Sequence, residues 1–228
     1  MSDRTATIIG ATGLIGNYLL QQLIQDESFN TIRLLVRRPF KNENSKVEIK
    51  LIDFNDHESF KLGIDGSDVV FCAVGTTQKK VRGDKEAYRK IDHDIPVNAA
   101  RFCKETGCNT FLFVSSVGAD AKSKNFYLQL KGEVEDEIKK IYLENVSVFR
   151  PSILVGDRKE SRPGERIGQI AMQTFSFILI NNLRKYKPIH AKDVAVAMVY
   201  SASQQKPGFS IYEYDEMKKM PPSPKEEH

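Results

Sequence analysis

A serine, a tyrosine and a lysine near the middle of the chain could move a proton to or from an oxygen atom. Ser116 follows an apolar run, and Tyr127 precedes Lys131 by four residues, a spacing that puts both side chains on one face of a helix. A free phenol titrates near pH ~10, and a neighbouring ammonium group lowers that value. The set predicts that Tyr127 exchanges the proton, Lys131 lowers its pKa and Ser116 binds the reacting oxygen.

The same tyrosine–lysine spacing is also common on solvated helix faces. The surrounding elements therefore determine whether the pair is interpreted as catalytic. At the start of the chain an apolar run over residues 5–9 leads into three glycines spaced three apart, and an amphipathic stretch follows. Such glycines let backbone N–H groups approach a pyrophosphate at a helix N-terminus and let that helix pack close to a sheet. The predicted cofactor-binding turn comprises Gly10, Thr12, Gly13, Leu14, Ile15 and Gly16.

Apolar runs of strand length alternate with amphipathic runs of helix length along most of the chain. This alternation predicts an α/β fold, a Rossmann-type doubly wound parallel sheet with helices on both faces. We expect one NAD(P)-binding domain over residues 1–216, with a small substrate-covering region at about 152–190, and a flexible tail over 217–228. The expected strands are 5–9, 31–36, 46–52, 68–74, 110–114 and 145–149, and the expected helices are 14–25, 86–106, 126–143 and 191–203.

Two arginines follow the second expected strand, where an NAD site usually carries an acidic residue. A guanidinium group suits the 2′-phosphate of NADP, and an acid would repel it. Arg37 follows the strand directly, so we expect it to be the phosphate ligand, with Arg38 as the second candidate and one of the two facing solvent. The predicted cofactor is therefore NADP(H) in preference to NAD(H).

The ends of the next two expected strands complete the predicted cofactor site. Asp53 could accept a hydrogen bond from adenine, although a turn residue or helix N-cap there is an equally good interpretation. Small residues after the fourth strand would let the backbone pass close to the adenine and its ribose, and Lys131 could reach the ribose of the nicotinamide half. The candidates at these two strand ends are Asp53, Phe54, Ala73, Val74, Gly75 and Thr76.

The composition describes an ordinary globular protein: 40% of the 228 residues are hydrophobic, 28% are charged, and the formal net charge is +4. Its basic residues are scattered, which argues against a nucleic-acid partner. No apolar run reaches the ~20 residues that a membrane span needs. None of the three cysteines forms a C-x-x-C pair, and a strand begins too early for a signal peptide, so we expect a reduced, cytoplasmic protein.

The triplet Asp92, His93 and Asp94 has the composition of a metal site. Adjacent residues on a helix point in different directions, however, and cannot ligate one ion together. We therefore expect a surface or pocket-rim position for the triplet and assign no metal.

Several stretches in combination resemble the short-chain dehydrogenase/reductase superfamily, in particular its atypical or extended branch. The resemblance is greatest to the Tat-interacting-protein-like oxidoreductase group and extends over residues 5–205, approximately. It rests on GATGLIG at 10–16, SSVGAD at 115–120, YLQLKGEVE at 127–135, FRPSIL at 149–154 and DRKESRPGE at 157–165.

The resemblance implies a Rossmann fold, NADPH binding and a Ser-Tyr-Lys catalytic set. One residue departs from the pattern, since Ser152 stands where the group is expected to carry glycine, which would alter the shape of the nicotinamide pocket. The residues implied are Ser116, Tyr127 and Lys131 for catalysis and Pro151 and Ile153 beside the nicotinamide.

These observations together favour an NADPH-dependent oxidoreductase that acts on a small carbonyl or hydroxyl substrate. A nucleotide-sugar epimerase or dehydratase would use the same parts, and a non-enzymatic NADP(H) sensor or protein-binding regulator could share the scaffold. The polar run 157–165 is expected to cover the substrate, with arginines that face either an anionic group or nearby glutamates. The apolar stretch within 167–180 is interpreted as a lid, a homodimer face or an interfacial helix.

Overall fold

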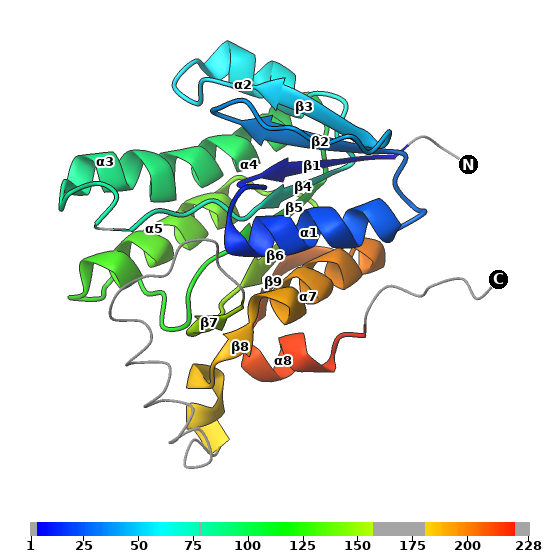
Figure 1. Ribbon diagram of the computed structural model, residues 1–228. Helices are drawn as coiled ribbons and strands as arrows, with labels where there is room; N and C mark the ends of the chain where they lie inside the picture. Colours follow the sequence, from blue (N-terminus) through cyan, green and yellow to red (C-terminus); the bar gives the residue numbers. More distant parts are fainter. Residues whose placement is uncertain (1–3, 78, 157–180, 222–228) are drawn as a thin grey trace.

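The computed structural model describes residues 4–77, 79–156 and 181–221. These residues form a seven-stranded parallel sheet in the order β3-β2-β1-β4-β5-β6-β9, with helices on both faces (Figure 1). The doubly wound Rossmann-type prediction is therefore confirmed. The strands are β1 (Thr5–Ile9), β2 (Thr31–Val36), β3 (Val47–Leu51), β4 (Val69–Cys72), β5 (Thr110–Val114), β6 (Asn145–Phe149) and β9 (Gly208–Tyr212).

Side chains that alternate along the strands fill two separate apolar cores. Ile8 contributes to one core and Ile9 to the other, and Leu34 and Leu35 divide in the same way. The first core lies under α1 (Leu14–Gln25), α7 (Ala191–Gln204) and α8 (Tyr214–Lys219). The second lies under α2 (His57–Ile64), α4 (Ile95–Thr106) and α5 (Phe126–Lys140). The strands between the two edge strands are thus covered on both faces, as is usual for parallel sheets.

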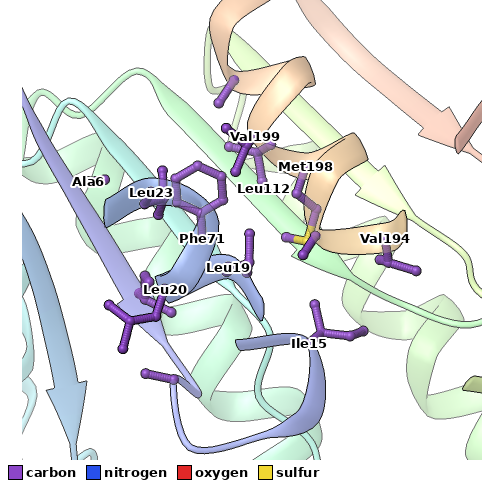
Figure 2. Packing of buried hydrophobic residues seen from close by; sticks show 14 of the residues in the cluster. Ala6, Ile15, Leu19, Leu20, Leu23, Phe71, Leu112, Val194, Met198 and Val199 are labelled. Atoms are coloured by element: carbon purple, nitrogen blue, oxygen red, sulfur yellow. The ribbon is translucent and has the colours of Figure 1, made fainter. Parts of the chain in front are cut away.

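The first core joins the start of the chain to its end. In Figure 2 the side chains of Leu19 and Leu23 on α1 lie toward those of Met198 and Val199 on α7, above Phe71 of the sheet. Each of these side chains is at most 2% exposed, so the two helices exclude water between them. This packing fixes α1, and with it the glycine-rich turn that precedes it.

Helix α1 occupies the predicted residues, but several other boundaries differ. The helix expected over 86–106 is wrong as a single α-helix: α3 (Lys85–Arg89) and α4 are separated by a π-helical turn, η1 (Lys90–Asp94). Helix α5 ends at Lys140, three residues before the predicted end. Helix α2 and edge strand β9 were not predicted; β9 begins with glycine and is half-exposed, so it lacks the continuous apolar run of a central strand.

The boundary predicted for a mobile tail at residue 217 falls inside α8. Met217 is 1% exposed and packs into the first core, and a capping box formed by Glu213 and Glu216 starts the helix. The composition of this segment did not indicate a helix, because one buried methionine and a capping box suffice to dock a short helix against α7.

Two glycines allow the close approach of β1, α1 and the segment after β4. Gly10 has a φ of +93°, and a Cβ there would lie 2.8 Å from the Ala73 carbonyl carbon. A Cβ on Gly16 would lie only 2.1 Å from the Gly10 carbonyl oxygen. Since these obstacles are backbone atoms, they cannot move aside as a flexible side chain would.

We expect Gly16→Ala to lower the unfolding midpoint by about 5 °C or more, because the added methyl group overpacks rigid backbone. Gly63→Ala is the matched control: Gly63 is also in a helix, and its Cβ would meet only the side-chain ends of Leu35 and Ile52 at 3.1–3.2 Å. Thermal unfolding followed by circular dichroism measures both. Equal losses in the two variants would contradict a specific backbone clash at Gly16.

Candidate active site

The glycine-rich turn leaves the N-terminus of α1 open to an anion. The helix begins at Leu14. Its N-cap residue is Gly13, so no side chain caps it, and the first turn holds no acidic residue. The amide of Gly13 donates to the carbonyl of Gly10 at 2.9 Å, which closes the turn. The N–H groups of the first helical turn and the helix dipole would favour a phosphate there, and phosphate binding by this turn stays a prediction.

Arg37 and Arg38 directly follow β2, the strand next to the glycine-bearing strand β1. Both arginines are exposed, and neither has an ion-pair partner within the described ranges. Their guanidinium groups are thus available to an anionic ligand at the carboxyl end of the sheet.

Asp53 serves as a turn residue. Its Oδ1 accepts hydrogen bonds from the Asn55 backbone N–H at 3.0 Å and from the Asn55 side chain at 2.9 Å, whereas the cap of α2 is Asp56. Phe54 packs edge-on against Phe60, with ring centroids 4.8 Å apart. The structure thus favours the turn alternative for Asp53, and an adenine contact stays a prediction.

The segment 73–76 links the glycine-rich turn to a buried carboxylate. Ala73 lies against Gly10, and the Thr76 amide donates to Asp92 Oδ2 at 2.7 Å. Gly75 also lies beside Asp92, because a Cβ there would be 3.5 Å from its Oδ1. The predicted cofactor segment is therefore held in place by a residue that sequence reasoning did not include in the site.

Asp92 forms a buried ion pair with Lys131. The two residues are 1% and 3% exposed, and Lys131 Nζ lies 3.1 Å from Asp92 Oδ1. Burial alone would lower the pKa of Lys131, but the Asp92 carboxylate and the Tyr127 phenol outweigh it, so the pKa is raised above its ordinary value. Lys131 is consequently an ammonium ion at neutral pH.

The expected surface or pocket-rim position of the triplet is wrong for Asp92 and His93, which are both buried. The π-helical turn η1 widens the helix, so that Asp92 contacts Lys131 while the next residue, His93, contacts Glu137 at 3.0 Å; both partners are on α5. The described residues hold no group of three or more histidine, cysteine or acidic side chains that could bind a metal ion.

Tyr127 and Lys131 lie together on α5, as their spacing predicts. Asn125 caps the helix by accepting from the Tyr127 and Leu128 amides, and Lys131 Nζ lies 6.0 Å from the centre of the Tyr127 ring. The half-buried Ser116 begins the turn that connects β5 to α5. Further along that turn the Asp120 amide donates to the Leu128 carbonyl at 3.1 Å, which ties the turn to the first turn of the helix.

The segment after β6 lies beside this turn. The Val117 amide donates to the Pro151 carbonyl at 3.0 Å, and the Ser152 hydroxyl donates to the Lys187 carbonyl. The Ile189 amide donates to the Ile153 carbonyl at 3.0 Å, where β7 (Leu154–Val155) pairs in parallel with β8 (Ile189–His190). The predictions for residues 157–180, including the polar run and the apolar stretch, lie outside the described residues.

The known proteins that this chain resembles in sequence are consistent with this architecture. A family described as NAD(P)H-binding matches residues 10–164. Protein HTATIP2 from Rattus norvegicus is 36% identical over 168 residues, which are 72% of this chain and 69% of that protein. The mitochondrial protein FMP52 from Candida albicans is 35% identical over 192 residues, 82% of each chain.

Solved structures with low sequence identity share the fold. MoeE5 in complex with UDP-glucose and NAD superposes with a TM-score of 0.69 at 15% identity, over 93% of this chain and 76% of that one. A UDP-N-acetylglucosamine 4-epimerase from Methanobrevibacter ruminantium has a TM-score of 0.69 at 17% identity, over 93% and 77%.

The relatives also correct one expectation. Those named FMP52 are designated mitochondrial, which contradicts the cytoplasmic location predicted from the sequence.

Among the described residues, none of the helices has the length and the apolar character that a membrane-spanning helix needs. The family match covers most of the chain, and HTATIP2 and FMP52 are similar to it in sequence. The chain therefore belongs to the NAD(P)H-binding family, within the atypical short-chain dehydrogenase/reductase group.

Proposed function

We propose that this protein is an NADPH-dependent oxidoreductase that reduces a small carbonyl compound to an alcohol. The observation that carries the proposal is the buried Lys131 ammonium, which is paired with Asp92 and lies beside Tyr127 in an NAD(P)H-binding fold. A positive charge next to a phenol has a clear use in acid–base chemistry at an oxygen atom. The mitochondrial designation of the FMP52 relatives supports the same location for this protein.

Each residue of the set has a defined role in this reaction. Bound NADPH would supply a hydride to the carbonyl carbon and would leave as NADP+. Tyr127 gives its proton to the carbonyl oxygen, so that the substrate becomes the alcohol and Tyr127 becomes a phenolate that solvent reprotonates. Lys131 stabilises that phenolate and binds the ribose of the nicotinamide half, and the Ser116 hydroxyl donates a hydrogen bond to the carbonyl oxygen as its negative charge develops.

The coenzyme site is proposed along the carboxyl edge of the sheet. The open N-terminus of α1 would bind the pyrophosphate, and Pro151 and Ile153 would contact the nicotinamide. The exposed guanidinium group of Arg37, which has no ion-pair partner among the described residues, would bind the 2′-phosphate, with Arg38 nearby, which is the basis for preferring NADP(H).

An epimerase of nucleotide sugars is the second candidate, because structural neighbours include proteins with that title. Such an enzyme returns the hydride to the substrate, so the coenzyme is not consumed. A screen of carbonyl compounds followed by NADPH absorbance separates the two: the oxidoreductase depletes NADPH in proportion to product. Interconversion of a nucleotide sugar without NADPH loss would favour the epimerase.

Tyr127→Phe is expected to lower kcat by at least about 100-fold, because it removes the proton donor. The affinity for NADPH, measured by fluorescence titration, should stay within about threefold, since a phenylalanine ring still packs against Lys131. The matched control is Tyr142→Phe, at an exposed tyrosine after α5. Turnover that survives in Tyr127→Phe would mean that the proton comes from elsewhere.

NADPH is expected to bind at least about tenfold more tightly than NADH, a difference of about 1.4 kcal/mol. Arg37→Ala should weaken NADPH binding and leave NADH binding unchanged, because only NADPH has the 2′-phosphate. Isothermal titration of both coenzymes measures the gap, and Arg38→Ala tests whether its neighbour contributes. Equal affinities of the unaltered protein for the two coenzymes would refute a role of the arginines.

Asp92→Asn keeps the hydrogen bond from the Thr76 amide but removes the charge opposite Lys131. Burial is then opposed mainly by the Tyr127 phenol, so the pKa of Lys131 should fall, and the alkaline limb of kcat/KM against pH should move to lower pH. Asp94→Asn is the control, since the Asp94 carboxylate contacts His93 rather than Lys131. An unchanged limb in Asp92→Asn would show that Lys131 does not govern it.

The raised pKa of Lys131 also makes the free energy of unfolding depend on pH. Because the pKa of Lys131 is raised above 10.5 in the folded protein, the ion pair stabilises the fold below that pH and the contribution is lost as pH rises through the folded pKa. Unfolding by urea at increasing pH should therefore show a loss in the unaltered protein that is smaller in Asp92→Asn.

A further inference from the structure

Helix α5 has a third polar side chain in line with Tyr127 and Lys131. Glu135 follows Lys131 by four residues, so the three lie on one face of the helix. Glu135 is only 4% exposed. A carboxylate buried to this degree needs compensating partners, and its partners show what it connects.

The Glu135 carboxylate has two partners, each at the end of a central strand. Arg150, which follows β6, donates from Nε to Oε1 at 3.0 Å and from Nη2 to Oε2 at 2.5 Å. The hydroxyl of Ser115, which follows β5, also donates to Oε1. The pKa of Arg150 is raised chiefly by these hydrogen bonds from its side chain to Glu135, which outweigh its partial burial.

Both partners are the immediate neighbours of residues in the candidate site. Ser115 precedes Ser116, and Arg150 precedes Pro151. The two strand ends are also joined by their backbones, since the Ser115 amide donates to the Phe149 carbonyl at 2.7 Å. One buried carboxylate thus connects the helix that carries Tyr127 to the two strand ends that carry the oxygen-binding and nicotinamide-contacting residues.

Stability alone does not account for this choice of residues. Apolar side chains of similar volume often replace a buried ion pair with no loss of stability, because the pair must first be stripped of water. What an apolar pair lacks is direction: the two parallel hydrogen bonds of a guanidinium group and a carboxylate fix both distance and rotation.

On the basis of the proposed function, we propose that Glu135 is a positioning residue. Through Arg150 and Ser115 it sets the rotation and depth of α5, and this places the Tyr127 hydroxyl at the oxygen atom that Ser116 binds. The Lys131–Asp92 pair holds the other flank of the same helix face against η1. Glu135 itself touches neither substrate nor coenzyme.

The test separates direction from stability with a double variant. Glu135→Leu combined with Arg150→Met replaces the ion pair by apolar side chains of similar size, and Asp136→Asn removes an exposed carboxylate from the next position of α5 as a control. We expect the double variant to unfold within a few degrees of the unaltered protein and to bind NADPH within about threefold, while kcat falls at least about tenfold. Asp136→Asn should change none of the three.

A second readout does not require turnover. In protein labelled at the tyrosine ring Cζ, the Tyr127 resonance is assigned by its disappearance in Tyr127→Phe, and its chemical shift reports the surroundings of the ring. It should move in the double variant and stay in place in Asp136→Asn. If the unaltered protein reduces no carbonyl compound, the proposed function fails, and the resonance alone then decides the positioning role.

Two results would overturn the proposal: a double variant with unchanged kcat, or an unmoved Tyr127 resonance. Should the double variant fail to fold, Glu135→Gln decides by the same measurements, because it keeps the size and the hydrogen-bonding oxygen but not the charge. A lowered kcat with intact NADPH binding then supports the role, and an unchanged kcat excludes it.

Discussion

The ion pair between Lys131 and Asp92 is the interaction on which the candidate site depends. A lysine that is 3% exposed keeps its charge only if a carboxylate lies beside it, and Asp92 Oδ1 does so at 3.1 Å. The second oxygen of Asp92 holds the Thr76 amide at 2.7 Å. One electrostatic requirement therefore fixes three segments relative to one another: α5, the π-helical turn and the loop after β4.

Close backbone contacts make this arrangement compact. A Cβ on Gly132, next to Lys131, would lie 2.1 Å from the Ala121 amide nitrogen, so α5 presses directly on the turn that begins with Ser116. In the same way Gly16 brings α1 close to the turn after β1, and Gly10 brings that turn close to Ala73. The two halves of the candidate site, the glycine-rich turn and the helix with the polar face, are both positioned by glycines whose missing side chains let backbone meet backbone.

Family membership and chemistry rest on different observations. The family match establishes an NAD(P)H-binding fold, and solved structures at 15% and 17% identity establish its architecture. The two candidate functions, a reductase and an epimerase, differ in where the hydride ends, and a shared fold does not distinguish them.

Local patterns in the sequence were enough to predict six of the seven strands of the sheet, helix α1, the glycine-rich turn and the pairing of Tyr127 with Lys131, because each depends on spacing along a few residues. Only the tertiary structure revealed Asp92 and Glu135, whose partners are 39 and 15 residues away at Lys131 and Arg150. The π-helical turn that points Asp92 inward has no signature in hydrophobic periodicity. Buried charges are stabilised by partners that folding brings from distant positions, so their roles become visible only once the chain is packed.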